Sequence, residues 1–89
     1  MSKHELSLIR GLGWTNGERT AAFFARADGE CIQVEVALDL WSRCLDREIR
    51  PRTPWTEPTP GEAYDAVERL ALAALVGGEK PRAHLLTVR

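Results

Sequence analysis

The fold of this chain is decided by one stretch, Arg19-Thr-Ala-Ala-Phe-Phe-Ala-Arg-Ala27, then Asp28-Gly29, then Glu30-Cys-Ile-Gln-Val-Glu-Val-Ala37. Two runs of strand-forming residues flank the Asp-Gly pair. A two-residue loop of this composition favours a type I′ turn, because both central residues need positive φ and the turn's twist matches that of the strands. We therefore predict an antiparallel hairpin over residues 19–37.

The turn also sets the register of the hairpin, with Ala27 opposite Glu30. One face of the hairpin is then entirely apolar, whereas a slip of one residue would place Gln33 and Glu35 on it. The apolar face is formed by Ala21, Phe23, Ala25, Ile32, Val34 and Val36. An isolated hairpin is marginally stable in water, so this face needs a covering layer.

Composition limits the class of protein. The 89 residues predict a single domain, 1–89, and the 12 basic and 13 acidic residues nearly cancel. A general binder of nucleic acid or anionic membranes is normally more basic. No apolar run approaches the ~18 residues of a membrane-spanning helix, and the N-terminus lacks the apolar core of a secretion signal. A cytoplasmic protein without a membrane partner is expected.

The two cysteines, Cys31 and Cys44, are too few for a disulfide framework and lack metal-ligand spacing. We expect reduced, partly buried thiols. A bridge between them would require the following helix to fold back over the hairpin.

Residues 5–14 favour a first strand, joined to the hairpin through Asn16-Gly17. In that register Leu8, Leu12 and Trp14 reach the core face. Arg10 would also reach it, opposite Phe23, unless the neighbouring glycines form a bulge. A short helix over residues 4–10 is the alternative.

A short helix is expected at about 39–48, with Asp39 as its cap. Its apolar stripe contains Leu38, Trp41 and Leu45, with Cys44 beside it.

A second helix is expected at about 60–76. Thr59, Pro60 and Glu62 form a capping box, and Gly77-Gly78 supplies the left-handed conformation that ends a helix.

Residues 82–89 favour a last strand, with Leu86 and Val88 on one face. The predicted fold class is α+β: a small antiparallel sheet of three or four strands, with the central hairpin 19–37, covered on one face by the two helices.

Residues 49–60 contain four prolines, which exclude a helix or a strand ladder, and long ordered loops often carry function. Trp55 in this segment either closes the edge of the core or forms an exposed anchor for a partner. Arginines precede it along the chain, and their guanidinium groups suit carboxylates or phosphates. The candidate partner-binding residues are Arg43, Arg47, Arg50, Arg52 and Trp55.

No catalytic or metal-binding pattern emerges from the sequence. His4 and His84 lack a nucleophile or carboxylate at a motif spacing, and His84 is interpreted as a strand residue. The glycines at 11, 13 and 17 do not match a dinucleotide fingerprint, and a strand rather than a helix follows them. The sequence therefore predicts no enzyme, no cofactor and no metal.

The hairpin closed by Asp28-Gly29, the Asp-Ala-Val-Glu-Arg run at 65–69 and the Leu-Leu-Thr run at 85–87 resemble a group of short bacterial proteins grouped as a domain of unknown function. The resemblance covers about residues 19–89, and the Trp-Thr-Glu-Pro-Thr-Pro run at 55–60 departs from it. It implies the same order of hairpin, helix, helix and strand, and transfers no site residues.

Small size, near-neutral charge and the lack of catalytic motifs favour a non-enzymatic protein-binding module. A stoichiometric inhibitor of phage or mobile-element origin, of the anti-CRISPR kind and acting on a larger complex, belongs to this class. The alternative is a nucleic-acid-associated protein that uses the arginines at 43, 47, 50 and 52. A homodimer is also predicted, through an outer patch of Ile9, Ala22 and Phe24 and through open edge strands.

Overall fold

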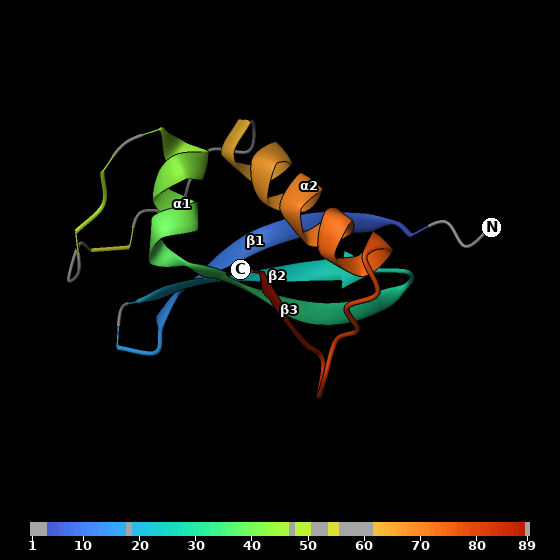
Figure 1. The fold of residues 1–89 in the computed structure, drawn as a ribbon. Coiled ribbons are helices and arrows are strands. Elements are labelled where there is room, and N and C mark those ends of the chain that lie inside the picture. The colour runs from blue at the N-terminus through green and yellow to red at the C-terminus, as the bar shows by residue number, and fades with distance from the viewer. Residues whose placement is uncertain (1–3, 18, 47, 51–53, 56–61, 89) are drawn as a thin grey trace.

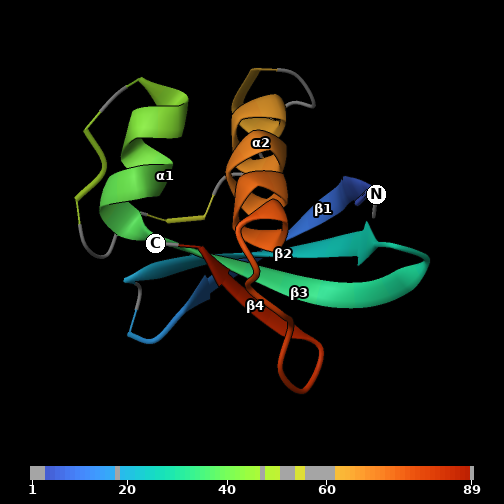
Figure 2. The ribbon, with the colours of Figure 1, turned by 45° about the vertical axis from the view of Figure 1, so that its right-hand side comes forward.

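The structure is a computed structural model that describes residues 4–17, 19–46, 48–50, 54–55 and 62–88. Its elements follow the order β1 (Leu6–Thr15), β2 (Thr20–Ala27), β3 (Glu30–Ala37), α1 (Leu38–Leu45), α2 (Glu62–Val76) and β4 (Leu85–Val88). The four strands form one sheet in the order β1-β2-β3-β4. Both helices lie on the same side of this sheet (Figures 1 and 2). The predicted α+β class with two covering helices is confirmed.

The central hairpin has the predicted register. Ala27 pairs with Glu30, Phe23 pairs with Val34, and the pairing continues to Thr20 opposite Ala37. The turn residues Asp28 and Gly29 have φ values of 51° and 85°, as a type I′ turn requires. The turn is also anchored to the chain before β1, since Asp28 N donates to the Glu5 carbonyl oxygen over 2.9 Å.

The N-terminal strand forms as predicted, and its predicted register holds at Leu8, opposite Ala25, but is wrong from Arg10 to Thr15. Thr15 pairs with Thr20, so the connection spans residues 16–19 instead of Asn16-Gly17 alone. The register then shifts at Ile9 and again at Leu12, each of which is left without a partner on β2. As a result Arg10 lies opposite Phe24 instead of Phe23. The bulges resolve the conflict over Arg10 and remove Leu12 from the core face.

The fourth strand corrects the expected sheet type. β4 runs parallel to β3, with Val34 opposite Leu86 and Val36 opposite Val88, so the sheet is mixed instead of purely antiparallel. The reason is the connection: the two helices cross one face of the sheet and return the chain to the end where β3 started. Figure 2 shows β4 beside β3 after this crossover.

A tight turn precedes β4. Arg82 and Leu85 exchange two backbone hydrogen bonds of 2.9 Å, and between them Ala83 and His84 have φ values of 51° and 62°. His84 is therefore a turn residue, and its interpretation as a strand residue is wrong. Its carbonyl oxygen still joins the sheet by accepting a 2.8 Å hydrogen bond from Gln33 N.

The first helix starts directly after β3 and is shorter than predicted. Ala37 is its N-cap and makes no side-chain cap bond, so Asp39 lies inside the first turn and is not the cap. The helix ends at Leu45 because Asp46 adopts the left-handed conformation.

The second helix ends at Val76, as the Gly77-Gly78 pair predicts. Gly77 N donates to the Ala73 carbonyl oxygen over 2.9 Å, and Gly78, with a φ of 100°, continues the C-cap. The capping box expected at Thr59 and Pro60 lies outside the described residues.

The core lies between the sheet and the helices, with Phe23 fully buried at its centre. Its ring is 4.9 Å from Trp41 of α1 and 6.0 Å from Tyr64 of α2, measured between ring centroids, in edge-on geometry. One β2 side chain thus contacts both helices. These aromatic contacts fix how the helical layer sits on the sheet.

Candidate functional site

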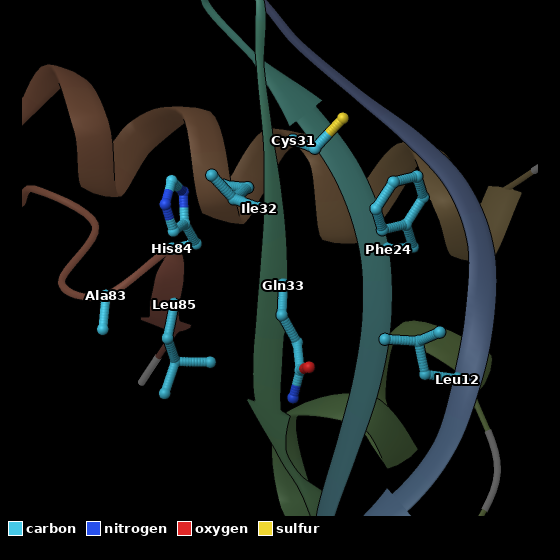
Figure 3. Close-up of a pocket in the computed structure, with 8 residues that line it drawn as sticks. All are labelled: Leu12, Phe24, Cys31, Ile32, Gln33, Ala83, His84 and Leu85. Atoms are coloured by element: carbon cyan, nitrogen blue, oxygen red, sulfur yellow. The ribbon is translucent and has the colours of Figure 1, made fainter.

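No described element covers the sheet face opposite the helices, and we call it the outer face. It carries a hollow of about 410 Å³ that spans all four strands, and Figure 3 shows the side chains around it. The lining residues are Leu12, Phe24, Cys31, Ile32, Gln33, Ala83, His84 and Leu85.

The bulges of β1 contribute directly to exposed apolar surface. Leu12 is 44% exposed and Ile9 is 49% exposed, although both are large aliphatic residues within a strand. A regular strand would pair every residue and turn alternate side chains to the core, whereas a bulge re-aims the unpaired one. Phe24 of β2 lies half-buried in the same hollow as Leu12.

The predicted outer patch of Ile9, Ala22 and Phe24 is thus partly revised. Ala22 is only 3% exposed, so it adds little contact surface. Leu12 lines the hollow together with Phe24, and Leu85 lines it on the other side of Gln33.

The charges of the outer face lie around the hollow. No Asp, Glu, Lys or Arg lines it among the described residues. Arg10 and Arg26 are exposed and lie on the same face, opposite Phe24 and Cys31 respectively in the strand pairing. Glu35 is 9% exposed, and its carboxylate accepts a hydrogen bond from the Gln33 amide nitrogen over 3.3 Å.

Cys31 and His84 line the same hollow. No hydrogen bond joins their side chains in the part of the chain that the structure describes. Figure 3 shows them coming from different elements, Cys31 from β3 and His84 from the turn before β4. A nucleophile needs its base within hydrogen-bonding reach, so this arrangement gives no support for acyl or thiol chemistry.

A second concave surface lies between the two helices, and we call it the helix cleft. Its inner part has a volume of about 460 Å³ and is lined by Leu40, Arg43, Cys44, Ala66, Arg69 and Leu70. A wider part of about 770 Å³ extends to β1 and is lined by Leu6, Arg43, Cys44, Asp65, Ala66, Glu68, Arg69 and Leu72.

Cys44 lies on the floor of the helix cleft. Burial raises the pKa of its thiol, and the nearby Arg69 charge partly opposes that rise. The thiol is therefore held in its protonated, less nucleophilic form. Both cysteines are free, as predicted, and Cys44 is half-buried, but Cys31 is exposed, so the prediction of a partly buried thiol is wrong for Cys31.

The sequence-predicted partner residues fall in different places. Arg43 is exposed at the helix cleft, and Arg50 follows α1 in a segment held by a 3.2 Å hydrogen bond from Ile49 N to the Ser42 hydroxyl oxygen. The predictions for Arg47 and Arg52 lie outside the described residues.

Trp55 packs against the aromatic core. Its ring centroid is 5.1 Å from that of Trp14, edge-on, and 6.3 Å from that of Trp41 in a stacked arrangement. It also lies 5.8 Å from Phe23. This packing supports the interpretation in which Trp55 closes the edge of the core, and the role of its remaining surface in binding stays a prediction.

Sequence reasoning missed two residues that these surfaces depend on, Leu12 and Arg69. The sequence places Leu12 on the core face because the glycines beside it indicate a possible bulge but not which residue that bulge leaves unpaired. Arg69 is not among the site residues that the sequence predicts, although its spacing from Ala66 and Leu70 repeats that of Arg43 from Leu40 and Cys44. That repeat was the available signal.

Within the described ranges, no group of three or more His, Cys, Asp or Glu side chains could hold a metal ion. Across the same residues, neither helix combines the length and the apolar character needed to cross a membrane.

No protein-family model, curated protein or solved structure matches this chain. The resemblance to the bacterial domain of unknown function therefore stays a prediction, and the surfaces themselves carry the functional argument.

Proposed function

We propose that this chain is a non-enzymatic protein-binding module whose contact surface is the outer face. The observation that carries the proposal is the hollow that Leu12, Phe24 and Leu85 help to line, on a sheet face that neither helix covers. Exposed apolar side chains that lie together with polar residues around them are found at protein interaction sites.

The charge pattern supports a protein partner. The centre of a protein interface is depleted of charged residues and enriched in aromatic ones, whereas its rim is polar. Phe24 lies at such a centre, and the exposed Arg10 and Arg26 lie on the same face beside it.

A narrower form of the proposal is a stoichiometric inhibitor of phage or mobile-element origin, of the anti-CRISPR kind, that blocks a larger complex in the cytoplasm. The small size and near-neutral charge of the chain support this form. Such a protein acts by occupying a surface, so inhibition should saturate at a fixed molar ratio to its target.

Affinity capture with three forms of the protein tests the proposal. Leu12→Asp places a charge in the hollow, whereas Val76→Asp places the same charge on α2, where Val76 is 70% exposed. A partner retained by the wild type and by Val76→Asp, but lost with Leu12→Asp, is the expected result. Calorimetry with the captured partner then gives the molar ratio.

Circular dichroism and melting curves establish that both variants fold. Equal retention of the partner by all three folded forms would show that the outer face is not the contact surface. Catalytic turnover of a substrate by the purified chain would contradict the non-enzymatic assignment.

A further inference from the structure

The two walls of the helix cleft repeat one pattern. Each helix contributes an apolar or weakly polar residue, an arginine three positions later and another such residue one position after that. On α1 these are Leu40, Arg43 and Cys44, and on α2 they are Ala66, Arg69 and Leu70. Residues at this spacing share a helix face, so the cleft has an apolar floor with one arginine on each wall.

Neither arginine is engaged by another side chain of the described residues. Arg43 and Arg69 are exposed, whereas the four other residues of the inner cleft are half-buried. Neither guanidinium group forms an ion pair or hydrogen bond with a described residue. Asp65 precedes Arg69 by one helical turn but is not paired with it, and no acidic residue lines the inner cleft.

The acidic residues near the cleft lie in its wider part. Glu68 is engaged there, since its carboxylate accepts a 2.8 Å hydrogen bond from Leu8 N of β1. The inner cleft thus combines apolar surface with two positive charges that have no partner within the described residues. This pattern is complementary to an apolar surface with negative charges on both of its sides.

We propose that the helix cleft binds an amphipathic helix of a partner protein, whose apolar stripe is flanked on both sides by acidic residues. Two neighbouring helices leave a groove into which the side-chain ridge of a third helix packs. Recognition of an amphipathic helix by a groove of this kind uses apolar anchors at i, i+3, i+4 and i+7. The acidic flanks would meet Arg43 on α1 and Arg69 on α2.

This surface lies on the opposite side of the sheet from the outer face, so its test is independent of the proposed function. The probe is a synthetic peptide of about 18 residues, long enough to form a helix, with Leu at the four anchor positions and Glu on both flanks. Fluorescence anisotropy gives its affinity, and amide chemical shifts of the labelled protein locate its contact. The largest shifts are expected at residues 40–44 and 66–70.

A peptide with Lys in place of Glu should bind the wild type at least about tenfold more weakly, because it meets two like charges. Charge reversal of the cleft, Arg43→Glu with Arg69→Glu, should invert this preference. The matched control is Arg19→Glu with Arg82→Glu, which produces the same net charge at exposed positions away from the cleft. The control variant should still prefer the acidic peptide.

The peptide exchange on the wild type does not depend on the folding of any variant. The proposal would be overturned if the wild type bound the two peptides with equal affinity, or if the chemical-shift changes were confined to the outer face. It would also be overturned if the control variant lost its preference for the acidic peptide in the same way as the charge-reversed cleft. A duplex oligonucleotide that binds through Arg43 and Arg69 with strong salt dependence, and displaces the acidic peptide, would overturn it in favour of a nucleic-acid partner.

Discussion

Glu68 of α2 accepts a 2.8 Å hydrogen bond from the backbone N–H of Leu8 in β1, across 60 positions of sequence. β1 is an edge strand, and this amide points away from β2. The carboxylate therefore links α2 to the sheet. It also satisfies a backbone N–H group that could otherwise bind a strand of another molecule. The other edge is also protected, because β4 is short and Leu85 is already bonded to Arg82.

Removal of this contact should destabilise the fold. Glu68→Ala leaves the Leu8 amide without its acceptor and should lower the free energy of unfolding by about 1–3 kcal/mol. Glu68→Gln keeps a carbonyl acceptor and should lower it less. Urea titration measures both, with Asp65→Ala as the control on the same helix. A loss no greater than that of the control would show that the hydrogen bond contributes little.

The two adjacent phenylalanines of β2 should differ in their contribution to stability. Phe23 is fully buried against both helices, so Phe23→Ala should lower the free energy of unfolding by roughly 3–5 kcal/mol. Phe24 is half-buried on the outer face, and Phe24→Ala should cost clearly less. Equal losses in urea would contradict the assignment of the two faces.

Substitutions in the turn before β4 should increase the stability of the folded protein. Ala83 and His84 both adopt positive φ, which costs side-chain-bearing residues about 1 kcal/mol or more each, whereas Asn and Gly accept it readily. Ala83→Asn with His84→Gly should therefore raise the free energy of unfolding by about 1–2 kcal/mol. Thermal melting checks this, and an unchanged or lower melting temperature would show that the native pair makes compensating contacts.

Asp28 should make stability depend on pH in the acid range. A hydrogen bond with the His4 ring, followed in importance by one from Glu5 N, lowers the pKa of the Asp28 carboxyl below its ordinary 3.8. Because the folded-state pKa is the lower one, the stabilisation is present above the unfolded-state pKa and is lost as pH falls through the folded-state value. Unfolding titrations from neutral pH into this acid range should show the loss.

Asp28→Asn should remove part of that acid dependence while keeping a residue that tolerates positive φ. Asp46→Asn is the matched control, since Asp46 also has positive φ, at 53°, and no side-chain hydrogen bond among the described residues. Identical pH profiles for the two variants would assign the acid dependence to other groups.

Self-association should proceed through the outer face instead of the sheet edges. We expect a homodimer at high concentration, which Leu12→Asp abolishes and Val76→Asp preserves, because only the first charge enters the hollow. Light scattering decides the question. A mass near 9.9 kDa at every concentration would exclude the dimer.

The features that could be predicted from the sequence are those whose causes are local. Asp28 and Gly29 form the turn, and the turn sets every residue pair of the β2–β3 hairpin. The cause is local, because only these two adjacent residues must adopt positive φ. Gly77-Gly78 ends α2 for a similar reason. The apolar face of the hairpin follows from the two-residue period of a strand, and it identified Phe23 as a core residue.

Features that depend on residues distant in the sequence could not be predicted in this way, because they arise when the elements pack together. The bulges that expose Ile9 and Leu12 arise where β1 must fit β2, and the parallel direction of β4 follows from the path of two helices across the sheet. The helix cleft exists because packing on Phe23 brings Arg43 and Arg69 to facing walls, although 26 positions separate them in the sequence. Periodicity assigns a residue to a face of its own element, but which element it meets depends on the packing of the whole chain.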